Sequence, residues 1–420
     1  DHLAHRAFSD RLHGAFGVLN IEQEVADALR LDLPQHREVH VDDVLVAGQH
    51  QAFFRHITNG RTAAHVVDKT FVEAHPDDYG TPSVGSIGTG PFKFKEWVQG
   101  SHAVLERNPD YWDKAKPNLD RVVLRPLPDS QSRFASLKSG ETDLVWVDEF
   151  EADNIERAKK DSTLQVLSYA GSGAAVAAFN TKVEPLDDVK VRQAFAQSVD
   201  VQKIITVVYK GLFPVAKGVI PPDLPGYNPN LKGLKFDPAA AKQLLKDSKY
   251  GGNLPPVTYT VAGSSTTVSP FTEAVLEQWK TNLGIDIRVQ QIEWATFLGD
   301  LKRNPAQNKT NKYQMYESGW VADYPDPQDF VEVLFSSTSL ENNGSYKNAD
   351  VDRLVQQARS ESDEAKRFSL YQQAEQIIVN EAALVPLINS ESHQLVKPYV
   401  KGFVPPPMSM PTFRYISIEK

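Results

Sequence analysis

The sequence predicts an α/β protein of two lobes, built from mixed sheets flanked by helices. Its 420 residues exceed the length that one hydrophobic core usually serves, and 41% of them are hydrophobic, which is enough to fill more than one core. From about residue 62 onward, strand patterns of period two alternate with helix patterns that have recognisable first and last residues. No run of about 18 uncharged apolar residues occurs, so the sequence predicts no membrane-spanning helix.

Composition excludes several classes of protein. The net charge of −9 and the dispersed basic residues argue against a nucleic-acid-binding protein. The absence of cysteine excludes disulfides, thiolate metal sites and cysteine nucleophiles. The start Asp1–His5 has neither the basic nor the apolar region of a signal peptide, so we expect a mature, truncated or cytosolic chain.

The first recognisable elements follow residue 62. Alternating apolar and charged residues predict a β-hairpin over 92–107, with its turn at 98–101. After it come the strand Arg121–Leu127, a short helix capped by Asp129 or Ser130 and stopped by Gly140, and the strand Asp143–Val147. This order predicts a compact β-α-β unit.

Helix starts are the clearest local signals in the second half of the chain. They are Asp187 or Asp188, Asp200, Asp237 before Pro238, and Ser269 before Pro270. An acidic or hydroxyl side chain can accept hydrogen bonds from the free N–H groups of the first turn. Proline is best tolerated at the first helical position, so the pairs Asp237-Pro238 and Ser269-Pro270 each predict the start of a helix.

A strand, helix and strand follow one another at Val257–Ala262, Pro270–Leu283 and 285–289, which predicts a parallel pair of strands. The later predicted elements are a helix at Trp294–Leu301, a strand at Tyr313–Tyr316, helices at Asp350–Arg359 and Asp363–Asn380, and a strand at Leu384–Ile388. The strand at Tyr313–Tyr316 runs into a predicted loop, Gly319–Pro327. Ligands gather beyond the carboxyl ends of strands in α/β sheets, so this loop is placed for recognition.

The predicted loop has the chemistry to hold a ligand without transforming it. Asp323 can accept charge-assisted hydrogen bonds from an ammonium group, and Trp320 and Tyr324 can pack on apolar parts of a ligand. The backbone of Gly319 and Val321 can pair with an extended peptide. The alternative is a rigid, proline-braced turn whose aromatic side chains belong to the core.

The glycines and serines of the chain form no familiar phosphate-binding or nucleophile motif. Gly85, Gly88 and Gly90 lack the spacing and the following helix of a phosphate-binding loop, and they are typical of a turn. Ser172 lacks the flanking residues of a nucleophile elbow, and only two histidines lie beyond residue 76. A serine hydrolase is therefore not expected.

The first 61 residues are rich in histidine and have no assigned fold beyond a possible helix at Glu22–Leu29 and strand at Val39–Val46. His36 and His40 are four residues apart and would share a helix face able to hold a metal. Glu38 does not directly follow the first histidine, as a zinc peptidase motif requires. We expect surface histidines, no metal and no cofactor, and keep a metal-dependent hydrolase as the enzyme alternative.

Several separated segments form an ordered series. They are Gly88–Phe94, Leu105–Trp112, Ser139–Asp143, Ala178–Thr181, Asp188–Phe195, Gly319–Pro327 and Val400–Phe403. In this order they resemble motifs of the peptide and nickel class of extracytoplasmic solute-binding proteins. That class includes the dipeptide- and oligopeptide-binding proteins of ABC importers, and the resemblance covers residues 62–420.

The resemblance implies a two-lobed fold like that of periplasmic binding proteins, in the class II or Venus-flytrap arrangement. Such a protein captures a peptide or similar small solute between its lobes and delivers it to a membrane ABC permease. It implies a monomer that is not an enzyme and binds no nucleic acid, at the periplasmic or extracellular face of the membrane, with any lipid anchor in a segment outside this sequence. Oligosaccharides, opines and nickel chelates are alternative ligands, and a signalling receptor domain is an alternative role.

The same resemblance implies lobes and site residues. Lobe I would comprise residues 62–178 and 396–420, lobe II residues 179–395, with a hinge near Phe179. Asp323 would hold the α-ammonium of a peptide, and Trp320 with the backbone of Gly319 and Val321 would line the cleft. The remaining candidate ligand-binding residues are Tyr324, Tyr169 and Ser172.

The chain departs from the family in two respects. Family members normally have well over a hundred residues before the position of Gly88, whereas 87 precede it here. No arginine lies between Asn304 and Trp320, where peptide-binding proteins can place a partner for the ligand carboxylate. Lys312 could replace it as a point charge, without the two-pronged geometry of arginine.

Overall fold

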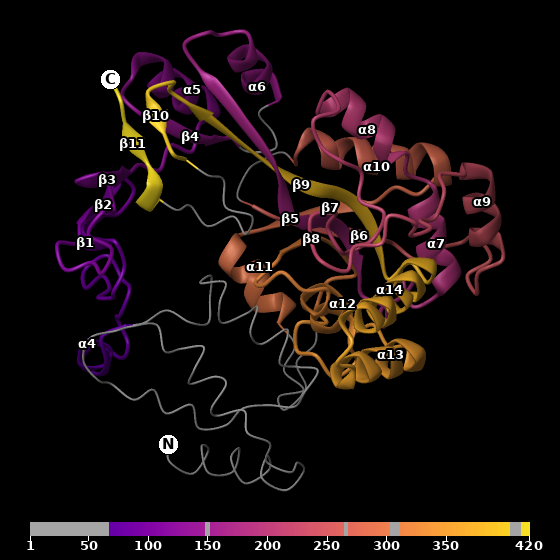
Figure 1. The fold of residues 1–420 in the computed structure, drawn as a ribbon. Helices are drawn as coiled ribbons and strands as arrows, with labels where there is room; N and C mark the ends of the chain where they lie inside the picture. Colours follow the sequence, from indigo (N-terminus) through magenta and orange to yellow (C-terminus); the bar gives the residue numbers. More distant parts are fainter. Residues whose placement is uncertain (1–66, 148–151, 264–267, 303–310, 404–412) are drawn as a thin grey trace, which may run out of the picture.

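The computed structural model describes residues 67–147, 152–263, 268–302, 311–403 and 413–420 (Figure 1). The helix predicted at Glu22–Leu29, the strand predicted at Val39–Val46, and His36 and His40 lie outside these residues. Among the helices in the described ranges, none is long and apolar enough to cross a membrane.

A six-stranded sheet with the order β4-β9-β5-β8-β6-β7 forms the centre of the molecule. Its strands are β4 (Leu144–Val147), β5 (Gln165–Phe179), β6 (Thr258–Ala262), β7 (Arg288–Ile292), β8 (Met315–Val321) and β9 (Leu384–Val396). β6 is parallel to both β7 and β8, whereas β5 is antiparallel to both β8 and β9. The predicted mixed sheet and its parallel pair are confirmed, but β7 begins at Arg288 rather than at residue 285.

The long strands β5 and β9 run side by side from the smaller part of the molecule, which contains β4, into the larger part (Figure 1). Their ladder changes register between Ala170 and Ala174 of β5. At this break Gly171 and Gly173 lie against Ser390, and a Cβ at Gly171 would come within 2.8 Å of the Ser390 Cβ. Glycine is therefore required where the backbones approach most closely.

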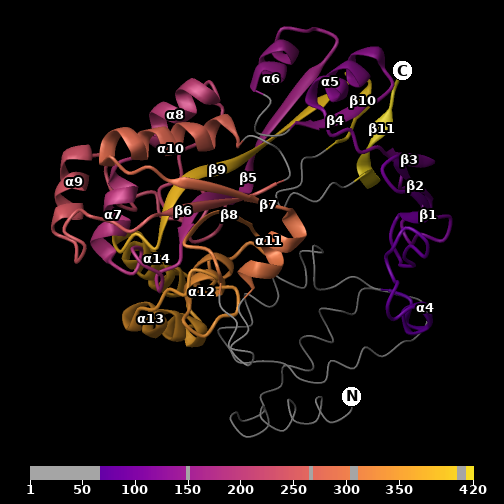
Figure 2. The ribbon, with the colours of Figure 1, turned by 180° about the vertical axis from the view of Figure 1, so that it is seen from behind.

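Helices cover both faces of the larger part of the sheet (Figures 1 and 2). One face carries α7 (Val189–Gln197), α8 (Val201–Val208), α9 (Pro238–Lys246) and α10 (Pro270–Leu283), and the other carries α12 (Gln328–Phe335), α13 (Ala349–Ser360) and α14 (Glu364–Asn380). Side chains of a strand point alternately to its two faces. Met315 of β8 accordingly packs with the first group of helices, and Trp320 packs against the second. Helix α11 (Trp294–Leu301) packs on Tyr313 and Tyr316.

The smaller part contains short elements from both ends of the described chain. They are α4 (Lys69–Ala74), β1 (Phe92–Val98), β2 (His102–Arg107), β3 (Arg121–Leu124), α5 (Ser130–Ser139), α6 (Ala152–Lys159), β10 (Val400–Lys401), a 3-10 turn (Phe413–Tyr415) and β11 (Ser417–Ile418). The hairpin predicted at 92–107 is confirmed as β1 and β2. The predicted β-α-β unit is wrong, because β3 joins that hairpin whereas β4 pairs with β9 in the central sheet. The partner of β4 comes from the C-terminal part of the chain, so local sequence does not reveal it.

Side-chain caps confirm the predicted helix starts. The caps are Asp129 for α5, Asp188 for α7, Asp200 for α8, Asp237 for α9 and Ser269 for α10. Each accepts a hydrogen bond from a backbone N–H in the first turn of its helix, a contact that depends only on neighbouring residues. Gly140 and Gly284 end α5 and α10 with φ of 80° and 73°, in the left-handed region that favours glycine.

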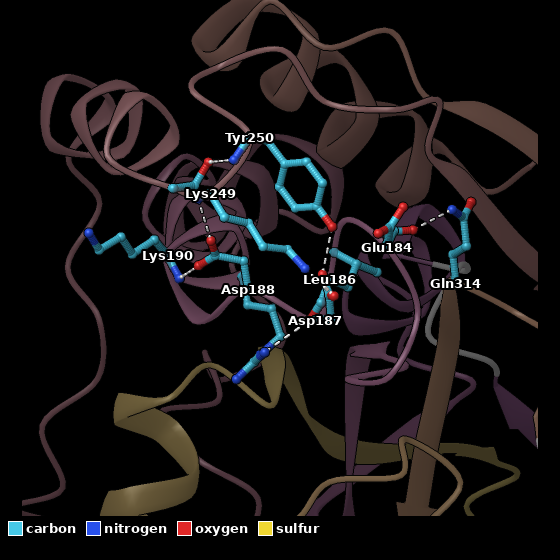
Figure 3. Close-up of polar contacts among 10 residues, drawn as sticks. Glu184, Leu186, Asp187, Asp188, Lys190, Lys249, Tyr250 and Gln314 are labelled. Carbon is cyan, nitrogen blue, oxygen red and sulfur yellow. Dashed lines mark hydrogen bonds and ion pairs between the residues drawn. The ribbon is translucent and has the colours of Figure 1, made fainter.

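A polar network fixes the start of α7 (Figure 3). One carboxylate oxygen of Asp188 accepts a hydrogen bond from the backbone N–H of Lys190 at 2.8 Å, and the other accepts from that of Lys249 at 2.7 Å. The Tyr250 hydroxyl donates to Asp187 at 2.7 Å, and the ammonium of Lys249 forms an ion pair with the same carboxylate. These contacts join the segment after β5 to the segment after α9.

The same segment is tied to the sheet by two longer side chains. The amide of Gln314 donates to the Glu184 carbonyl at 2.8 Å (Figure 3), and its oxygen accepts from the Thr258 N–H at 2.9 Å. Arg192 donates to the Leu186 carbonyl at 2.9 Å. Gln314 therefore aligns the beginnings of β6 and β8.

Glu375 of α14 is a buried carboxylate, with 1% of its surface exposed. One of its oxygens accepts hydrogen bonds from the N–H groups of Val219 and Ile220 at 2.8 and 2.9 Å. Burial raises the pKa of Glu375 from its ordinary value of 4.5 to about 7, against the lowering effect of these two hydrogen bonds. The carboxylate therefore links α14 to the segment before α9, and its charge disfavours the folded state.

The difference in free energy of unfolding between Glu375→Gln and the wild type should depend on pH. It should favour the variant more at pH 8 than at pH 4.5. The pKa of Glu375 is higher in the folded state than in the unfolded state. The contribution of its protonated side chain to wild-type stability is therefore fully present below pH 4.5 and is lost as the pH rises through 7. The loss amounts to about 3 kcal/mol. Urea unfolding at both pH values measures it, with the exposed Glu277→Gln as control. An equal difference between Glu375→Gln and wild type at both pH values would contradict this account.

Candidate functional site

The candidate site begins at the end of β8. Gly319–Val321 still belong to the strand, where they pair with Gly173–Ala175 of β5. The loop predicted over Gly319–Pro327 is therefore wrong for its first three residues, because the ladder with β5 keeps them extended. The Ala322 N–H then donates to the Ser172 carbonyl at 2.8 Å, which continues the contact with β5 into the loop.

The buried carboxylate of Asp329 organises the residues on both sides of Ala322. A single oxygen of Asp329 accepts a hydrogen bond from the indole N–H of Trp320 at 3.2 Å and from the backbone N–H of Asp323 at 2.7 Å. Asp329 is 1% exposed, so these bonds lie in a region of low dielectric, where they are strong. Trp320 and Asp323 thus have their positions set by the first turn of α12.

The two remaining predicted residues of the loop differ in burial. Asp323 is partly exposed, as a residue that meets a ligand must be, whereas Tyr324 is buried. The Tyr324 hydroxyl donates to Gln328 at 2.7 Å. Burial and then the negative charges of Asp329 and Asp326 raise the pKa of Tyr324, which keeps the phenol neutral. The loop therefore holds a concentration of carboxylates, which suits a cationic group.

The second half of the loop is braced by a buried ion pair. Arg367 of α14 donates two hydrogen bonds to the Asp326 carboxylate, at 2.8 and 2.5 Å, and the two side chains are 1% and 0% exposed. Asp326 also accepts from the Gln328 N–H at 3.0 Å. This two-pronged geometry fixes orientation as well as distance. The alternative of a braced turn with core aromatics thus describes Asp326, Pro327 and the buried Tyr324, whereas Trp320, which packs on the core, and Asp323 stay partly exposed.

Asp329 and Arg367 were not predicted as part of the site, and Asp326 was predicted only as a member of the loop Gly319–Pro327, without a role of its own. Asp326 had a usable signal, because it precedes Pro327 in the same Asp-Pro pattern that predicts the start of α9. Arg367 had none, since its partner lies on another element.

The two candidates on β5 lie at different distances from the loop. Ser172 touches it through its carbonyl, and its buried hydroxyl has no hydrogen-bond partner within the described residues. Tyr169 pairs with Ser392 and accepts a hydrogen bond from the Gln394 amide at 2.9 Å. Tyr169 and Ser172 are three positions apart along the strand, a rise of about 10 Å. The structure therefore brings Ser172 to the site and leaves Tyr169 nearer the smaller part of the molecule.

One edge of β8 is open near the site. β6 pairs with β8 only at Met315 and Tyr316, so Glu317–Val321 have no strand partner on that side in the described part of the chain. The unpaired N–H and C=O groups of such an edge can bind an extended segment of another molecule.

The cations described near the site are paired with carboxylates, as Arg367 is with Asp326. Lys312, the predicted substitute for an arginine, forms an ion pair with Asp300 at 2.7 Å. The described ranges contain no group of three His, Asp or Glu side chains that could hold a metal ion. The site as described is suited to binding through hydrogen bonds and negative charge.

Comparison with protein families and with individual proteins points to the same family. The model of the bacterial extracellular solute-binding proteins, family 5, matches residues 36–342. The chain is 30% identical to heme-binding protein A of Haemophilus influenzae over 338 residues, which cover 79% of this chain and 60% of that protein. It is also 30% identical to the dipeptide-binding protein of Escherichia coli over 365 residues, covering 85% of this chain and 66% of that protein.

Solved structures agree with this family. The periplasmic binding protein DppA from Helicobacter pylori, in complex with the peptide STSA, superposes with a TM-score of 0.72 at 28% identity, covering 84% of this chain and 68% of that one. The murein tripeptide binding protein MppA of Escherichia coli gives 0.73 at 27% identity with the same coverage. The prediction of a periplasmic-binding-protein-like fold is confirmed. The chain spans about 60% to 66% of the length of the first two relatives.

Arg367→Met should destabilise the protein by about 3–5 kcal/mol, because it leaves the Asp326 carboxylate buried without its counter-charge. Urea unfolding measures the loss. The double variant Asp326→Asn with Arg367→Met should recover part of it.

Arg353→Met is the matched control, since Arg353 is 55% exposed and its partner Asp350 is 67% exposed. It should cost less than about 1 kcal/mol. A similar cost for the two single variants would show that the buried pair does not brace the loop.

Proposed function

The chain belongs to family 5 of the bacterial extracellular solute-binding proteins, and from that premise we propose that it captures a short peptide outside the cytoplasm for an ABC importer. The open edge of β8, leading directly to Asp323, is the observation that carries the proposal. An extended peptide can add to this edge as a further strand, with its main chain hydrogen-bonded to Gly319 and Val321. Its α-ammonium then meets Asp323 at the end of the strand.

The electrostatics of the loop support this orientation. Asp329 holds the Asp323 backbone and the Trp320 indole, so the carboxylate of Asp323 is presented from a fixed main chain. A preorganised acceptor loses little conformational freedom on binding, which favours affinity. Trp320 offers an apolar surface beside the charged group.

The proposed capture uses two lobes, residues 62–178 with 396–420 and residues 179–395. β5 and β9 connect them, and a protein that closes on a ligand needs a point in such connections where the backbone can bend. We place it at the register break of Ala170–Ala174 rather than near Phe179, because Phe179 is fully buried and paired with Met315. In this role the protein acts as a monomer. It binds its ligand and delivers it, chemically unchanged, to a membrane permease.

The names of its relatives include peptide-binding and heme-binding proteins. The strand edge favours the peptide, because a repeating main chain matches the spacing of unpaired groups along β8. The alternative of a metal-dependent hydrolase has no support in this family.

Short peptides should raise the melting temperature. A ligand at 100 times its dissociation constant adds about 2.7 kcal/mol to the free energy of unfolding. Thermal denaturation with a panel of di- to pentapeptides measures this, and N-acetylated versions of the same peptides are the control. Absence of any shift across the panel would overturn the proposed function.

Asp323→Asn should weaken a peptide found in this way by about tenfold or more, because a hydrogen bond to a charged group contributes roughly 1.5–3 kcal/mol. Isothermal titration calorimetry measures the affinity. The change should be much smaller for the N-acetylated peptide, which has no α-ammonium.

Asp286→Asn is the matched control, since the Asp286 side chain is 86% exposed between α10 and β7. It should leave the affinity unchanged. If Asp323→Asn did the same, the ammonium would be bound elsewhere.

A further inference from the structure

Glu317 lies on β8 two residues before Gly319. Because side chains alternate along a strand, Glu317, Gly319 and Val321 share one face of β8, which is the face that α10 covers. This end of β8 is also the carboxyl end of the three parallel strands β6, β7 and β8, where ligands of α/β sheets gather. Glu317 is thus on the same strand, and at the same end of the sheet, as the proposed peptide site.

A small cavity adjoins Glu317. Its lining includes Glu317, Ser269, Thr272 and the two tyrosines Tyr209 and Tyr259, together with apolar side chains such as Phe271 and Val275. The space that the centre of a water molecule can occupy is about 20 Å³, which is enough for one water or a group of that size. Glu317 and Ser269 are partly exposed, whereas Tyr259 and Thr272 are buried, so the cavity is reached past the first two.

No cation of the described residues forms an ion pair with the carboxylate of Glu317. Its one hydrogen bond among the described residues comes from the Thr272 hydroxyl at 3.4 Å, a long contact. Burial raises the pKa of Glu317, and no positive charge in that part of the chain offsets the effect. A partly buried carboxylate that has no cationic partner among the described residues costs free energy that a cationic ligand group can recover.

From this combination we infer that the cavity is a subsite for an alkylammonium group of the ligand, such as the side chain of a lysine residue, with Glu317 as the residue that binds it. An ammonium group has about the size of the one water that the cavity admits. Only the charged end of the side chain has to enter the cavity to reach the carboxylate, so its aliphatic stem lies at the opening of the cavity. The inference rests on the proposed function, because it assigns a side chain of the same peptide.

The register limits where the lysine stands in the ligand. Asp323 and Glu317 are six residues apart, and an extended chain spans at most about 3.3–3.6 Å per residue. A peptide whose α-ammonium is at Asp323 therefore has its lysine within about the first five residues.

Glu317 could instead serve only to stabilise helix α10, and that role predicts a different effect of its substitution. Ser269 caps α10 and accepts a hydrogen bond from the Thr272 N–H at 3.1 Å, so Glu317 lies near the positive end of that helix. If Glu317 only stabilised α10, Glu317→Gln would lower stability without changing the preference between charged and neutral ligands.

Isothermal titration calorimetry with matched peptides separates the two roles. Alanine tri- to pentapeptides with lysine at each position in turn are compared with the same peptides carrying acetyl-lysine, which has the same stem without the charge. In the wild type at least one lysine position should bind about tenfold or more tightly than its acetylated counterpart. In Glu317→Gln this ratio should fall to near one.

Glu273→Gln is the matched control, because Glu273 is an exposed residue of α10 that does not line the cavity. It should keep the wild-type ratio. A lysine preference that persists in Glu317→Gln, or its absence in the wild type, would overturn the inference and leave the proposed function standing.

A probe without a peptide main chain keeps the subsite testable if no peptide binds. Titration of 1,5-diaminopentane into the wild type and into Glu317→Gln should show binding that is weakened about tenfold or more by the substitution. Such binding without any peptide binding would support the subsite and overturn the peptide function. Absence of binding by both the peptides and the diamine would overturn both.

Discussion

The pairing of β5 with β8 on one side and β9 on the other is the constraint on which the rest of the structure depends. Among the described strands, β5 is the one that pairs with both the long strand β9 and the strand β8, which leads to the candidate site. The close approach of Gly171 and Gly173 to Ser390 allows this double pairing at the register break. This pairing places the Ser172 carbonyl where it accepts a hydrogen bond from the Ala322 N–H. The strand that connects the smaller and larger parts of the molecule therefore also holds the loop after β8.

Buried carboxylates shape the end of β8 from the other side. Asp329 binds two N–H groups around Ala322, Asp326 pairs with Arg367, and Glu332 accepts hydrogen bonds from Arg359 at 2.7 Å and Tyr371 at 3.2 Å. Each buried charge costs desolvation free energy, and each is compensated by charged or N–H partners from another element. The compensation makes the loop rigid, and a rigid loop is what a site of fixed orientation requires.

Glu317 differs from these carboxylates because, in the part of the chain that the structure describes, its partner is the Thr272 hydroxyl at 3.4 Å rather than a cation or a backbone N–H group. Asp323, on the partly exposed side of the same stretch, adds a second negative group. The edge of β8 therefore presents main-chain hydrogen-bonding groups between two carboxylates. Such a surface selects for an extended ligand with positive charges at a set spacing, and the absence of arginine from the segment between Asn304 and Trp320 fits the same selection.

The sequence by itself determined the local features of this protein. Caps such as Asp237 and Ser269, the hairpin at 92–107 and the parallel pair around α10 were all predicted, because each depends on residues close together in the chain. The ordered motifs also identified the family and drew attention to Asp323 before the fold was known.

Only the tertiary structure decided where β8 ends, that β3 and β4 belong to different sheets, and that Arg367 braces the loop. The cavity beside Glu317 was likewise not predictable, since its walls come from β6, α10 and β8. These features depend on contacts between segments far apart in the chain. Such contacts depend on how the two long strands pack, and no local pattern of residues encodes that packing.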